Sequence, residues 1–110
     1  MMRNSGNASK PAAGSERPIP PAVAQDVAEA LQRYDEVSPV LVNKFKKELR
    51  HFIILAAANP GRFHPTKSRF RRATLRRFPY HFLFREIPDG IRITLVRHHK
   101  RHPDYGSERE

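Results

Sequence analysis

The sequence predicts an α+β fold in which a helical hairpin packs on one face of a small, twisted antiparallel β-sheet. Apolar residues recur at steps of three and four over residues 23–56, which is the period of amphipathic helices. They alternate at steps of two over residues 80–95, which is the period of a half-buried strand. Two amphipathic helices need an apolar surface, and one face of the sheet supplies it.

The first 22 residues are predicted to be a disordered tail. They contain Pro11, Pro18, Pro20 and Pro21 and few large apolar side chains, so they cannot bury enough apolar surface to offset their ordering entropy. We expect disorder up to about Pro21, a single domain over residues 23–105, and a short C-terminal tail over residues 106–110. A domain of this size buries only about 60% of the surface of its unfolded chain, so its stability should be modest or depend on a partner.

Two helices are predicted after the tail. The first runs from Ala22 to about Glu36, because apolar side chains recur there on one stripe. Ser38 is a good N-cap for the second helix, and Pro39 suits its first position, where a missing N–H costs nothing. The motif Asn59-Pro60-Gly61 ends the second helix. The apolar stripe of the first helix comprises Val23, Val27, Ala30, Leu31 and Tyr34, and that of the second comprises Leu41, Phe45, Leu49, Phe52 and Ala56.

An antiparallel meander of at least three strands is predicted for the second half of the chain. Residues 61–68 form a loop, because Pro65 prevents a regular ladder. Residues 70–77 and 80–87 are strands, and the second of these places Tyr80, Phe82 and Phe84 on one face. Pro88-Asp89-Gly90 is a turn. The return strand alternates apolar and polar residues, with Val96 as an apolar exception.

The composition predicts an electrostatic partner. The 110 residues include 21 Lys and Arg against 11 Asp and Glu, a formal net charge of +10, which attracts polyanions such as nucleic acid or acidic proteins. The absence of cysteine excludes disulfides and thiolate metal sites. No apolar run approaches the roughly 20 residues that a membrane span needs. We expect a cytoplasmic protein with no membrane partner.

A basic stretch without acids lies between Glu48 and Glu86. Such a run is usually a solvated face. Intramolecular pairing would normally intersperse charges of both signs, and their absence here favours a binding surface as much as a solvated face. Both interpretations therefore stay open. Arginine outnumbers lysine here, and guanidinium groups bind phosphate and carboxylate with two parallel hydrogen bonds. We expect these arginines to cover the outer face of the sheet. The predicted partner-binding or nucleic-acid-binding residues are Arg69, Arg71, Arg72, Arg76, Arg77, Arg97 and Arg101.

A second cluster, "VRHHKRHPDY", ends the last strand at residues 96–105. Its histidines could bind a metal, but the cationic neighbours oppose it, so we predict no metal and no cofactor. Metal-free RNA cleavage needs a base, an acid and cations. The candidate residues for that chemistry are His81, His98, Lys100, Arg101 and Tyr105. The alternative is a basic, hydrated strand end, and the spacing does not decide between them.

Four short motifs follow one another between Asp26 and Tyr105. They are "DVAEALQRYDE", then "ANPGRFHP", then R-x-F-P-Y, borne by Arg76, Phe78, Pro79 and Tyr80, and last "VRHHKRHPDY", with Val96, His98, Lys100, Arg101, Pro103 and Tyr105. In this order they resemble the RelE/ParE family of toxins from bacterial type II toxin–antitoxin systems. The first is similar to the first helix of that family, the second to its A-x-x-P-x-x-F-x-P loop with altered intervals, and the last to its terminal V-x-H-x-R-R-x-P-x-Y. R-x-F-P-Y is the most specific of the four.

The resemblance implies a toxin neutralised by a cognate antitoxin with a flexible, often acidic segment. Operator DNA would be bound only indirectly, through the antitoxin. The motifs look more like the ParE-like branch, which inhibits DNA gyrase without being a nuclease, than the RelE-like branch, which cuts mRNA in the ribosome. An inactive basic relative is the third alternative.

Two departures from the family pattern concern activity. The family usually opens with a strand, whereas "SERPIPPAV" is rich in proline, which argues against a paired strand. A missing first strand would leave one edge of the sheet open. The family often has a Trp after the final Tyr, where this chain has Gly106.

Overall fold

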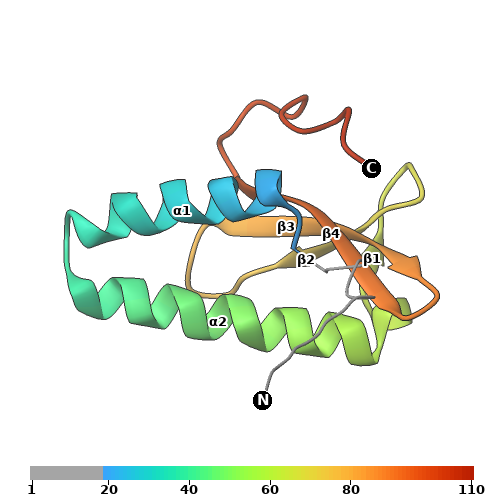
Figure 1. Ribbon diagram of the computed structural model, residues 1–110, viewed down its shortest axis with the longest axis horizontal. Coiled ribbons are helices and arrows are strands. Elements are labelled where there is room, and N and C mark those ends of the chain that lie inside the picture. The colour runs from blue at the N-terminus through green and yellow to red at the C-terminus, as the bar shows by residue number, and fades with distance from the viewer. Residues whose placement is uncertain (1–18) are drawn as a thin grey trace, which may run out of the picture.

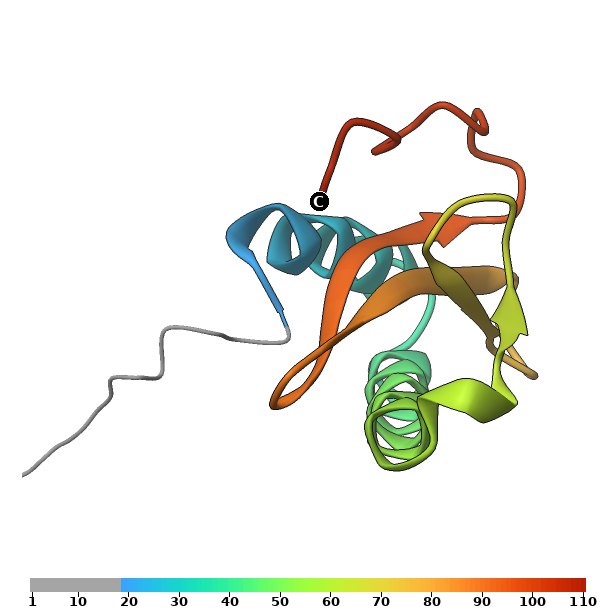
Figure 2. The same cartoon turned by 90° about the vertical axis from the view of Figure 1, so that its right-hand side faces the viewer.

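A computed structural model of the chain describes residues 19–110 and confirms the predicted α+β fold. Two antiparallel helices pack side by side on one face of a four-stranded antiparallel sheet (Figure 1). The chain beyond the last strand arches back over this strand and ends near the first helix (Figure 2). The disordered tail predicted for the start of the chain falls mostly on residues 1–18, which lie outside the described residues.

The helical hairpin consists of α1 (Pro21–Asp35) and α2 (Pro39–Ala58). The first helix begins one residue before the predicted start, with Pro21 at its first position. The N-cap prediction for the second helix is confirmed, because the Ser38 hydroxyl accepts a hydrogen bond from the backbone N–H of Val40 at 3.1 Å. A single 3-10 turn, η3 (Pro60–Arg62), follows α2.

The sheet has the strand order β1-β2-β3-β4, with every neighbouring pair antiparallel. The strands are β1 (His64–Pro65), β2 (Arg71–Thr74), β3 (Tyr80–Ile87) and β4 (Gly90–His98). Two predictions about strand limits were wrong. The loop over residues 61–68 contains the two-residue strand β1, where Pro65 is tolerated because β1 is an edge strand. The strand predicted over residues 70–77 ends at Thr74, because residues 75–79 leave the ladder and turn towards α2.

A β-bulge interrupts the β3–β4 ladder. Leu83 pairs with Leu95, but the next residue, Phe84, pairs with Ile93. Thr94 is therefore an extra residue on β4, and the alternation of faces shifts by one at this point.

The bulge explains the apolar exception in the last strand. Val96 returns to the helix side of the sheet, while Leu95 points to the outer face, where it is nonetheless only 1% exposed. The C-terminal segment covers it: a Cβ atom added to Gly106 would lie 2.8 Å from Leu95 Cδ2, and Gly106 has a φ of +77°. The predicted C-terminal tail at residues 106–110 is therefore packed against the sheet.

The core lies between the helices and the sheet. Aromatic rings meet edge to face there, with centroids 5.1 Å apart for Phe45 and Phe78 and 5.0 Å apart for Tyr34 and Phe78. This geometry suits the ring quadrupoles. The predicted common face of β3 is confirmed by the buried side chains of Tyr80, Phe82 and Phe84. In the part of the chain described here, no helix is long and apolar enough to cross a membrane.

Candidate functional site

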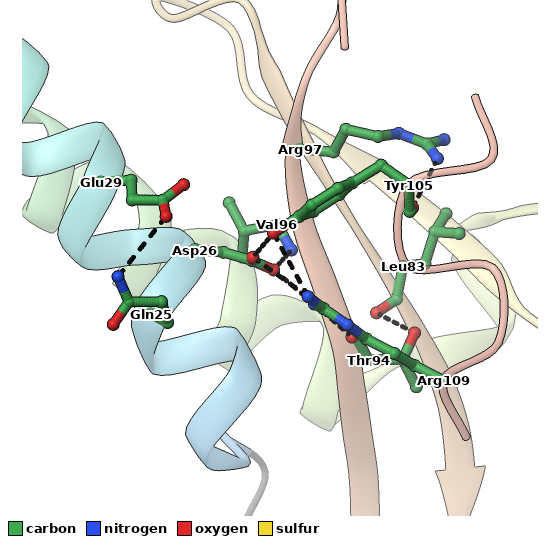
Figure 3. Close-up of polar contacts among 9 residues, drawn as sticks. All are labelled: Gln25, Asp26, Glu29, Leu83, Thr94, Val96, Arg97, Tyr105 and Arg109. Carbon is green, nitrogen blue, oxygen red and sulfur yellow. Dashed lines mark hydrogen bonds and ion pairs between the residues drawn. The ribbon is translucent and has the colours of Figure 1, made fainter. Parts of the chain in front are cut away.

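A buried carboxylate joins α1, β4 and the C-terminal segment (Figure 3). The Asp26 side chain is 1% exposed and accepts hydrogen bonds from the backbone N–H of Val96 at 3.0 Å and the Tyr105 hydroxyl at 2.5 Å. Arg109 Nη1 lies 2.6 Å from the same carboxylate and also donates to the Thr94 carbonyl at 3.2 Å. This Asp26 cluster holds the C-terminal segment against the strand.

The Asp26 cluster also covers part of an exposed sheet edge. Strand β4 is an edge strand among residues 19–110, as expected if a first strand is missing. The outward-pointing N–H of Val96 and C=O of Thr94 are nevertheless satisfied by Asp26 and Arg109. The expectation of an open edge is therefore wrong at this point, because an ion pair replaces the partners that a neighbouring strand would supply.

The Asp26 cluster engages one candidate catalytic residue. Tyr105 donates its proton to Asp26, which raises the pKa of the phenol, and hydrogen bonding to the same carboxylate raises the pKa of Arg109. The phenol is thus held protonated in a structural contact. The structural role of Asp26 was not predicted, although its spacing from Val23 and Ala30 places it on the buried stripe of α1, where an acid requires a partner.

An arginine-rich cluster lies on the outer face of the sheet, opposite the helices. Strand pairing places His81 opposite Arg97, and on the other side opposite Thr74. With Arg72 and Arg101 these residues border a cavity of about 340 Å³ that no carboxylate lines. We call this the outer-face cluster, and its members are Arg72, His81, Arg97, His99 and Arg101.

The hydrogen bonds of the outer-face cluster assign its tautomers. Arg97 Nε donates to His81 Nε2 at 3.2 Å, so Nε2 is an acceptor and the neutral ring carries its proton on Nδ1. His81 Nδ1 lies 3.0 Å from His99 Nδ1, which must then accept. Burial, followed by the charges of Arg97 and Arg72, lowers the pKa of His81 to about 4, so the ring is neutral at pH 7. His99 consequently presents an N–H to the cavity side.

A neighbouring histidine follows the same pattern. His98 Nδ1 accepts a hydrogen bond from the backbone N–H of Lys100 at 3.0 Å, which leaves Nε2 as its donor. Burial and the charge of Arg33 lower the pKa of His98. In this arrangement neither His98 nor the His81–His99 pair has a free imidazole lone pair. The free N–H groups of His98 and His99 are suited to donate to an anion, and none of the three rings is suited to remove a proton from a substrate.

The structure separates the residues proposed for RNA cleavage. His98, Lys100, Arg101 and Tyr105 line one groove of about 280 Å³ between α1 and the end of β4. His81 lies on the opposite face of the sheet, and Arg101 borders both cavities. Four of the five candidates therefore come together and one does not.

The predicted binding arginines do not all cover the outer face, which corrects that expectation. Arg71 pairs with Phe84 on the helix side, because adjacent strand residues point to opposite faces. Its guanidinium donates to the Phe63 carbonyl at 3.0 Å and lies 3.6 Å from the Glu86 carboxylate. Arg69 lies over the Phe70 ring. Only Arg72, Arg97 and Arg101 of the predicted set join the outer-face cluster.

Arg76 and Arg77 lie beside α2. Their backbone N–H groups donate to the Glu48 carboxylate, at 2.9 Å for Arg77. Glu48, which precedes the basic stretch in the sequence, thus contacts the middle of that stretch in the fold. The stretch is less isolated from negative charge than its composition indicated.

No protein-family model matches the chain, and no curated protein is significantly similar to it. Within residues 19–110 no group of three or more His, Cys, Asp or Glu side chains is placed to hold a metal ion.

Proposed function

We propose that this protein is the toxin component of a type II toxin–antitoxin system, that it inhibits DNA gyrase in the manner of the ParE-like branch, and that a cognate antitoxin neutralises it. The observation that carries the proposal is the outer-face cluster, which combines three guanidinium groups with imidazoles whose acceptor nitrogens are already used within the protein. It sits on the α+β fold that the sequence motifs imply. Such a surface binds anionic groups on a macromolecule.

The hydrogen bonding favours binding over cleavage. Metal-free RNA cleavage needs a group that accepts the proton of the attacking 2′-hydroxyl. His81 uses both ring nitrogens within the protein, and His98 and His99 each use their acceptor nitrogen. Tyr105 donates to Asp26. A toxin that acts by binding does not need a free base, so these contacts support the gyrase-directed alternative.

A growth assay tests the proposal. Induced expression without an antitoxin should halt growth and trigger DNA-damage signalling. Arg72→Glu with Arg101→Glu should relieve the arrest, because both side chains border the outer-face cavity and are exposed. Arg62→Glu is the matched control, since it reverses an exposed charge on η3 away from the cluster. Normal growth at a verified level of the unmodified protein would contradict the proposal.

A ribosome-dependent mRNA endonuclease is the second candidate function. It is favoured by the groove that brings His98, Lys100, Arg101 and Tyr105 together. It requires cleaved transcripts soon after induction and loss of cleavage on replacing His98 or Lys100 by Ala. Intact transcripts during growth arrest would exclude it and leave the gyrase proposal standing.

A further inference from the structure

A groove outside the outer-face cluster lies between α2 and the β2–β3 connection. Its volume is about 450 Å³. Four cationic side chains border it, namely Lys44, Lys47, Arg76 and Arg77, and the apolar side chains of Phe52 and Leu55 line it as well. We call it the α2 groove.

The geometry of the α2 groove is fixed by Glu48. Its carboxylate accepts the backbone N–H groups of Arg76 and Arg77, which ties the β2–β3 connection to the helix. The one acid in the groove is therefore occupied by the backbone, and the two guanidinium groups remain at its rim. Within residues 19–110 neither guanidinium forms a hydrogen bond or ion pair. Charge that the fold does not neutralise is available to a partner.

Exposed apolar side chains lie in the α2 groove and elsewhere on α2. Leu55 is 41% exposed and the adjacent Ile54 is 59% exposed, near the C-terminal end of α2. Val40, at the other end of the helix, is 57% exposed. Val40, Lys44, Lys47, His51 and Leu55 follow steps of three and four, so they form one stripe of about four turns. The stripe thus has apolar ends and a cationic middle.

We propose that the α2 groove binds an acidic amphipathic helix of a protein partner. Apolar side chains of that helix would cover Leu55 and Phe52, while its carboxylates would pair with Lys44 and Arg77 and their neighbours. The stripe on α2 and the arginines at the rim of the groove offer apolar contacts and positive charge side by side, which an acidic amphipathic helix can match. This binding requires neither growth arrest nor gyrase, so it stands or falls separately from the toxin proposal.

Other occupants fit the groove less well. A second copy of this chain is repelled by the formal charge of +10. The N-terminal residues 1–18 carry three basic residues and one acid, so the chain's own tail lacks the complementary charge. Nucleic acid would use the four cations but would leave the exposed Leu55 side chain of the groove in water.

The test measures fluorescence anisotropy of a labelled 18-residue synthetic helical peptide with leucines on one face and glutamates beside them. The full chain is titrated into it at low and physiological salt. Arg76→Glu with Arg77→Glu should weaken binding about tenfold or more, and Leu55→Ser by about threefold to tenfold. Arg50→Glu is the matched control, because Arg50 is an exposed cation of α2 that does not line the groove. At a given salt concentration, Arg50→Glu should change the affinity for the peptide by less than about twofold.

Three results would overturn the inference. The first is the absence of peptide binding at concentrations up to about 100 μM, which corresponds to a binding free energy of only about −5.5 kcal/mol. The second is an equal loss of affinity in Arg50→Glu, which would indicate non-specific charge attraction. The third is unchanged affinity in Leu55→Ser together with displacement of the peptide by single-stranded DNA, which would assign the groove to nucleic acid. Far-UV circular dichroism of each variant verifies that the substitution leaves the fold intact.

Discussion

Replacing Asp26 by Asn should destabilise the protein more than any other single isosteric change in the Asp26 cluster. The substitution keeps the shape of the side chain but removes its charge. Arg109, whose side chain is 19% exposed, then loses its counter-ion, and the hydrogen bonds from Arg109 and Tyr105 lose their ionic acceptor. Breaking a buried ion pair costs about 3–5 kcal/mol, and the partial exposure of Arg109 favours the lower end, about 3 kcal/mol. For a domain of this size that corresponds to a fall in Tm of roughly 12–24 °C.

Far-UV circular dichroism is the suitable assay, because the chain has no tryptophan to report unfolding by fluorescence. Asp35→Asn is the matched control, since Asp35 is an exposed acid at the end of the same helix. A double-mutant cycle with Arg109→Gln should give a coupling energy of about 2 kcal/mol, because both substitutions remove the same contact. A stability loss in Asp26→Asn no larger than that in Asp35→Asn would refute this prediction, and so would simple additivity of the two cluster substitutions.

Two further predictions concern the outer face. Gly106→Ala should cost about 1–3 kcal/mol, because its φ of +77° disfavours a side chain and the new Cβ would meet buried Leu95. Gly61→Ala, which meets nothing within 4 Å, is the control, and equal thermal stabilities for the two variants would contradict the packing of the C-terminal segment. The pKa of His81 is about 4 in the folded protein, below its ordinary value of 6.5, so the unfolded chain binds more protons between these values. Its contribution to stability is therefore present above pH 6.5 and is lost as the pH falls towards 4, by up to about 3 kcal/mol. Urea unfolding of the native chain and of His81→Gln across this range measures the difference, and an NMR titration placing the His81 pKa near 6.5 would refute it.

Local patterns predicted the helices and the central hairpin well. Ser38 and Pro39 fix the start of α2 through a cap and a preset backbone angle, which are properties of neighbouring residues. The turn at Pro88-Asp89 and Gly90 likewise follows from local backbone preferences. The alternation in β3 identified its buried face, because burial imposes a period of two.

Features that depend on distant contacts were not predicted. The bulge at Thr94 leaves only the consecutive apolar residues Leu95 and Val96 as a trace in the sequence. The Asp26–Arg109 contact joins residues 83 positions apart, so no local pattern encodes it.

The arrangement of the arginines was predicted only in part, for the same reason. Arg71 and Arg72 point to opposite faces because they are strand neighbours, and the strand ends before Arg76 and Arg77. Composition gave the charge of this stretch but not its distribution over the surface.

Inhibition of purified gyrase measures the central claim most directly. In a DNA supercoiling assay, the unmodified protein and Arg62→Glu should inhibit with similar potency. The pair Arg72→Glu and Arg101→Glu should raise the inhibitory concentration about tenfold or more, because it reverses charge at the outer-face cluster. Full supercoiling in the presence of excess unmodified protein, or equal inhibition by the cluster variant, would contradict the account.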